Sequence, residues 1–82
     1  MKRIRLGTAQ FEAKDGDKAY NLSAITRLAG HAQAEGAELV CFHECSISGY
    51  TYLETLNREE LEAVAEEVPG GHSVKYLVEI AR

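Results

Sequence analysis

The sequence predicts an α/β fold organised around a strand, helix, strand unit. Three observations support it: alternating side chains over residues 4–11, a helical repeat ending near Gly36, and a short apolar run over residues 38–43. Two strands joined by one helix within about forty residues are expected to pair in parallel. A chain of 82 residues with 45% apolar residues allows at most one globular domain.

The first strand is expected over residues 4–11, where Ile4, Leu6 and Thr8 alternate with Arg5, Gly7 and Ala9. A turn follows at residues 14–17, and Asp15 or Asp17 can cap the next helix. Apolar residues then recur at spacings of three and four, which is typical of one buried helix face: Leu22, Ile25, Ala29 and Ala32.

The second strand, residues 38–43, lacks alternation through residues 39–42. An unbroken apolar strand is typical of a sheet that is covered on both faces. We therefore expect both faces of this strand to be buried.

A further helix is predicted from a cap at Asn57, answered by Glu60, to about Val68. Its solvent-facing side would carry five acids, Glu59, Glu60, Glu62, Glu66 and Glu67.

Ser73 is predicted to cap a last helix with apolar positions at Val74, Leu77, Val78 and Ala81. Two strands cannot cover three apolar helix faces. We therefore expect residues 1–82 to be the N-terminal part of a single domain that continues beyond Arg82.

Composition excludes several classes of protein. The net charge of −4, without a basic cluster, argues against nucleic acid as a partner. No apolar run has the length of a signal peptide or membrane span, so no membrane partner and a cytoplasmic location are expected. Cys41 and Cys45 are expected to be reduced thiols in or near the core.

Glu44 is the candidate catalytic residue, because it follows the second strand directly. A carboxylate at the end of a buried strand is costly unless it is paired or used. Binding groups of parallel sheets collect where strands end. Gly49 would allow a sharp turn or close ligand approach. Tyr50 is expected either to line the substrate pocket, as a substrate-binding residue, or to pack beneath the loop.

No metal or other cofactor is expected. Cys41, His43 and Cys45 would share one face of a continued strand, but three ligands on adjacent rungs do not converge easily on one tetrahedral ion, and no fourth ligand is suitably spaced. Ile47 stands where the second histidine of a metalloprotease helix would be.

In residues 39–50 an apolar strand ends in Glu44, and Gly49 and Tyr50 follow five and six residues later. This segment resembles the first catalytic motif of the nitrilase superfamily, the carbon-nitrogen hydrolases. Residues 4–11, which include Thr8, Ala9 and Gln10, resemble that family's first strand, and the helix carrying Asn21 and Leu22 stands between the two strands as expected. Two departures are His43, where many members have proline, and Cys45, where an apolar residue is common.

The resemblance implies a four-layer αββα sandwich and a Glu, Lys, Cys triad in which Glu44 is the general base and acid. The expected substrate is a small non-peptide amide, or a nitrile, and homo-oligomers are common in the family. Neither Cys41 nor Cys45 matches the nucleophile, and no lysine in this sequence matches the triad lysine. Residues 1–82 alone are therefore expected to be inactive.

The alternative is a small α/β binding or regulatory module without catalysis. It would complete its sheet by dimerising and would use the Gly49-Tyr50 loop for recognition. Whether residues follow Arg82 would separate the two readings.

Overall fold

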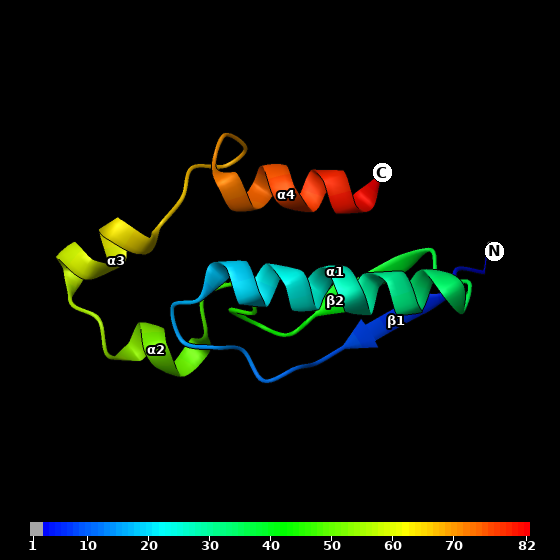
Figure 1. The fold of residues 1–82 in the computed structure, drawn as a ribbon, viewed down its shortest axis with the longest axis horizontal. Coiled ribbons are helices and arrows are strands. Elements are labelled where there is room, and N and C mark those ends of the chain that lie inside the picture. The colour runs from blue at the N-terminus through cyan, green and yellow to red at the C-terminus, as the bar shows by residue number, and fades with distance from the viewer. Residues whose placement is uncertain (1–2) are drawn as a thin grey trace.

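The computed structural model describes residues 3–82, which form a two-stranded sheet and four helices (Figure 1). Strands β1 and β2 are parallel, with Leu6 opposite Leu39 and Ala9 opposite Phe42. The predicted strand, helix, parallel strand unit is thus confirmed, with shorter strands than expected. The elements are β1 (Leu6–Ala9), α1 (Lys18–Ala34), β2 (Leu39–Phe42), α2 (Tyr50–Glu54), α3 (Arg58–Val64) and α4 (His72–Ala81).

Helix α1 carries the core. The Asp17 side chain caps it by accepting a hydrogen bond from the Tyr20 amide at 3.0 Å, which satisfies one free donor of the first turn. The predicted apolar face is confirmed, since Leu22 and Ile25 are 1% and 2% exposed. Ala24 completes the buried apolar set.

Helix α1 covers one face of the sheet. Contact is close at Gly7, where an added Cβ would lie 3.4 Å from the Cβ of Ala32. The opposite face is open: Leu6 and Leu39 are 57% and 54% exposed, and Cys41 is exposed. The predictions that β2 is covered on both faces and that Cys41 is near the core are therefore wrong for this chain. Alternate strand residues face opposite sides, and the helix packs against one of them.

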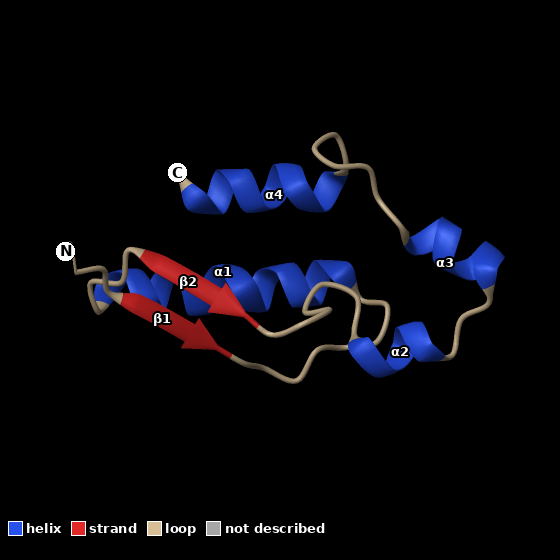
Figure 2. Cartoon of the chain, turned by 180° about the vertical axis from the view of Figure 1, so that it is seen from behind, coloured by secondary structure: helices blue, strands red, loops and turns tan. Residues whose placement is uncertain are grey.

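The second half of the chain runs around one end of the molecule and returns. Figure 2 shows α2 and α3 beyond the end toward which both strands point. Helix α4 then lies beside α1 and runs in the same direction (Figure 1). The short helix α2, which follows Gly49, was not predicted.

The predicted Asn57–Glu60 capping box is confirmed: each side chain accepts a hydrogen bond from the other residue's amide at 2.9 Å. Helix α3 ends at Val64, earlier than expected. Helix α4 begins at His72, so Ser73 lies inside its first turn and is not its cap. Among residues 3–82, no helix combines the length and apolar character needed to cross a bilayer.

Gly7→Val should lower the free energy of unfolding by about 1 to 3 kcal/mol, because a Cβ there would already touch Ala32 and Ala37, at 3.4 and 3.5 Å, and the two methyl groups of valine would have to fit beyond it. Thr8→Val is the matched control: it places the same valine side chain one residue later, at an exposed position. It should change stability by less than about 0.5 kcal/mol. Urea denaturation followed by circular dichroism measures both, and equal losses in the two variants would contradict this packing.

Candidate functional site

Strand β2 delivers Glu44 to the edge of the sheet. The strand ends at Phe42, and Glu44 opens a turn over residues 44–48. The Glu44 residue is exposed, whereas its place after an apolar strand suggested burial. Neither of the two cavities described below is lined by Glu44. Within residues 3–82 Glu44 is therefore presented to solvent, on a turn beyond the end of β2.

His43 lies immediately before this turn. Its ring packs edge-on against Phe11, with ring centroids 4.9 Å apart and an interplanar angle of 70°. Its Nδ1 atom is buried and has no hydrogen-bond partner among the described residues. A buried polar atom without a partner is uncommon in a folded protein. The edge-on contact with Phe11 therefore holds the ring next to Glu44.

The loop after Glu44 has an unusual backbone. Cys45 has φ of 56°, a left-handed conformation that non-glycine residues rarely adopt, and Gly49 has φ of 94°. The Gly49 amide donates to the Cys45 carbonyl at 2.8 Å and closes the turn. A Cβ at position 49 would lie 2.9 Å from Oδ1 of Asp15. Gly49 thus serves the sharp turn expected of it, and the group that approaches it closely is Asp15.

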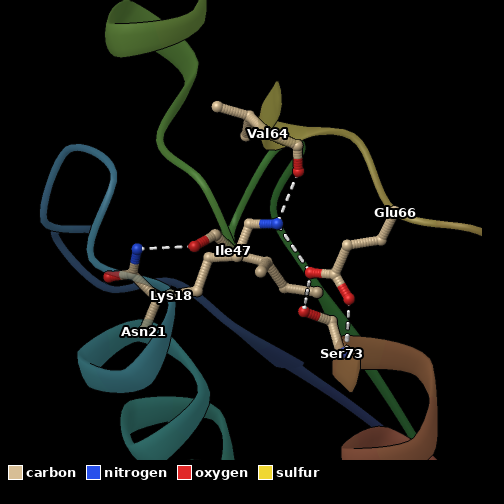
Figure 3. Close-up of polar contacts among 6 residues, drawn as sticks. All are labelled: Lys18, Asn21, Ile47, Val64, Glu66 and Ser73. Carbon is tan, nitrogen blue, oxygen red and sulfur yellow. Dashed lines mark hydrogen bonds and ion pairs between the residues drawn. The ribbon is translucent and has the colours of Figure 1, made fainter. Parts of the chain in front are cut away.

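Asn21, on the first turns of α1, ties together the loops that follow the two strands. Its side chain is completely buried. Its Nδ2 atom donates to the Ile47 carbonyl at 2.7 Å and to the Lys14 carbonyl at 2.9 Å, and its Oδ1 atom accepts from the Lys14 amide at 2.8 Å. The bond from Asn21 to Ile47 is drawn in Figure 3. The Gly16 amide adds a bond to the Ser48 carbonyl at 3.0 Å.

Sequence reasoning placed Asn21 on the right helix but assigned it no contacts. The available signal was an amide side chain beside Leu22 on the apolar stripe of a helix. A polar residue in such a stripe needs partners when it is buried. Which partners it finds depends on the two loops, which lie far from it in the sequence.

The two tyrosines of α2 lie differently. Tyr50, the predicted substrate-binding residue, is 53% exposed. Tyr52 is half-buried, and its ring lies 3.0 Å from where a Cβ on Gly16 would stand. Tyr52 therefore packs against the loop that precedes α1, while the substrate-binding role of Tyr50 stays a prediction.

A second polar cluster joins Lys18, Glu66 and Ser73 (Figure 3). The Lys18 ammonium donates to Glu66 Oε2 at 2.6 Å and to the Val64 carbonyl at 2.5 Å. Ser73 donates to the same carboxylate through its amide at 2.7 Å and through its hydroxyl at 2.5 Å. The cluster links the start of α1 to the start of α4.

These hydrogen bonds, with that of Lys18 the largest cause and those of Ser73 next, lower the pKa of Glu66 from 4.5 to about 2. The prediction that Glu66 belongs to a solvent-facing helix side is wrong, because α3 ends at Val64 and the chain turns before Glu66. The carboxylate instead accepts from the first turn of α4, where the helix dipole favours negative charge.

This cluster lines a cavity of about 440 Å³ whose other walls are mainly apolar, including Ile47, Leu53, Leu61, Val64 and Val74. A second cavity, of about 410 Å³, lies along β1 and α1. At this cavity Lys18 and Ser73 both donate to Glu66, and this arrangement explains how α4 is anchored.

Cys41 and Cys45 are free thiols, exposed and half-buried respectively. In the described part of the chain, no three His, Cys, Asp or Glu side chains are gathered where they would hold a metal ion. The candidate catalytic residue is therefore Glu44 on its loop, whereas the Lys18–Glu66–Ser73 cluster anchors α4.

Comparison with models of known protein families gave no match, and comparison with curated proteins gave no significant relative.

Acid should weaken the attachment of α4. Because the pKa of Glu66 is lower in the folded chain, its contribution to stability is fully present above about pH 4.5 and is lost as the pH falls toward about 2. Glu66→Gln should cost about 1 to 2 kcal/mol at pH 7 and flatten this part of the pH dependence. Urea midpoints measured from pH 7 to pH 2.5 test this, with Glu62→Gln, an exposed carboxylate, as the control. An unchanged slope in Glu66→Gln would contradict the assignment.

Proposed function

We propose that this chain supplies the general base and acid, Glu44, of a carbon-nitrogen hydrolase that acts on a small non-peptide amide rather than on a nitrile. The nucleophilic cysteine and the lysine of the site belong, in this proposal, to polypeptide outside residues 1–82. The observation that carries it is the position of Glu44: it leaves the carboxyl end of a parallel strand and opens a loop held by a buried amide.

The reaction needs one carboxylate that moves protons. Glu44 takes the thiol proton while sulfur attacks the amide carbon, and the lysine stabilises the negative charge on oxygen. The proton then passes to the departing ammonia or amine, which leaves a thioester. Glu44 next removes a proton from water, the resulting hydroxide attacks the thioester, and the acid product and the thiol are released.

The exposed sheet face supports a completing layer. Leu6 and Leu39 lie opposite each other on that face and are more than half exposed. Large apolar side chains grouped on one sheet face favour burial against another element. A layer packed there would run past the end of β2, and it would withdraw Glu44 from bulk solvent while leaving room for the one water that the hydrolysis consumes.

Glu44→Gln tests the proposal in the full-length protein that carries this chain. Ammonia release is measured on a panel of small amides and nitriles. The substitution keeps the shape of the side chain but removes the base, so kcat should fall by at least about 1,000-fold. Glu38→Gln, at the opposite end of β2 and also exposed, should retain wild-type turnover. Normal turnover in Glu44→Gln would show that Glu44 is not the base.

The same exposed face favours a second candidate function, a small module that dimerises and binds a partner without catalysis. Ile4, two residues before Leu6, is 61% exposed, and within the described residues neither strand of the two-stranded sheet has a second hydrogen-bonded neighbour. Sedimentation and intact mass separate the two candidates. A mature protein no longer than residues 1–82, dimeric and inactive on the whole panel, would favour the module.

A further inference from the structure

We infer that Asn21 is a positioning residue for Glu44: its side-chain bond to the Ile47 carbonyl sets the direction in which the Glu44 loop leaves β2. This inference rests on the proposed function, because it assigns Asn21 a role in the reaction of that same site. It is distinct from a packing role, since the buried amide contacts backbone atoms of two loops and no reacting group.

The orientation of the Asn21 amide is fixed. Its oxygen accepts from the Lys14 amide, so the nitrogen must face the carbonyls of Lys14 and Ile47. All these groups lie in a site where the asparagine is completely buried. Rotating or removing the amide would leave buried backbone groups without partners, which is unfavourable. Asn21 therefore holds the loop after β2 in a fixed position relative to the loop after β1.

The Glu44 loop has few other anchors. Within the loop, the Gly49 amide binds the Cys45 carbonyl, and outside it the Ser48 carbonyl accepts from Gly16. Asn21 provides the side-chain anchor, and it holds Ile47, three residues after Glu44. The left-handed backbone of Cys45 lies between the two, and such conformations persist where surrounding contacts impose them.

Misplacement of a catalytic group by about 1 Å can cost about 100-fold in rate. Releasing Ile47 should therefore reduce kcat more than it changes KM, because the carboxylate is displaced while the remaining binding surface is retained. A purely structural role would instead lower the amount of folded protein and leave kcat per folded molecule unchanged.

Two variants isolate the bond. Asn21→Asp keeps the acceptor for the Lys14 amide but loses both donations, and Asn21→Leu loses all three hydrogen bonds. Glu66→Gln is the matched control, since it weakens the anchoring of α4 and leaves the Asn21 contacts in place. Each is made in the full-length protein, and folded protein is quantified before kinetics.

The first readout is amide hydrogen exchange, which does not depend on activity. Both Asn21 variants should lose at least about tenfold protection at Gly16 and Gly49, with β1 and β2 amides still protected. Glu66→Gln should leave Gly16 and Gly49 protected. Full protection of these two amides in a folded Asn21 variant would overturn the inference.

The second readout is kinetic. Both Asn21 variants should lose about 100-fold in kcat, with KM within about threefold of wild type, while Glu66→Gln keeps kcat per folded molecule. Unchanged kcat in Asn21→Asp, together with an inactive Glu44→Gln, would overturn the positioning role and leave the proposed function standing. Full activity in Glu44→Gln would overturn both, even if the exchange result were as expected.

Discussion

The buried amide of Asn21 is the interaction on which the arrangement of this chain most depends. A parallel β-α-β unit sends both strand exits to one end of the sheet, where the backbone of each loop needs hydrogen-bond partners. Asn21 meets that need for Lys14 and Ile47 at once. Because it is neutral and completely buried, this link is independent of pH and protected from solvent. It gives the turn that begins at Glu44 a defined path despite the exposure of Glu44 itself.

The chain uses a second polar link, of different chemistry, to attach α4. There a carboxylate, Glu66, is shared between Lys18 of α1 and Ser73 of α4 (Figure 3). Its charge suits the positive end of the helix dipole and lowers its pKa. The Asn21 link holds the loop that carries Glu44, whereas the Glu66 link attaches α4 to α1. The two therefore differ in their response to acid and serve as controls for each other.

Local signals in the sequence predicted the parts of the structure that depend on residues close together in the chain. The Asn57–Glu60 capping box and the Leu22, Ile25 face follow from residues a few positions apart. The contacts of Glu66 could not be predicted, because Lys18 lies 48 residues away. Cys41 is exposed because α1 covers only one of the two sheet faces, a property of the assembled layers that an apolar strand pattern does not reveal. Helix α2 is five residues long and has no side-chain cap, so it lacked a sequence signal.

The distance from the Glu44 carboxylate to a cysteine sulfur supplied from outside residues 1–82 tests the central claim most directly. It is measured in an experimental structure of the full-length protein with an unreactive amide bound. The account predicts that a carboxylate oxygen lies about 3 to 4 Å from that sulfur, in a site closed to bulk water. A Glu44 carboxylate that remains in solvent, more than about 8 Å from every such sulfur and from the bound amide, would contradict it.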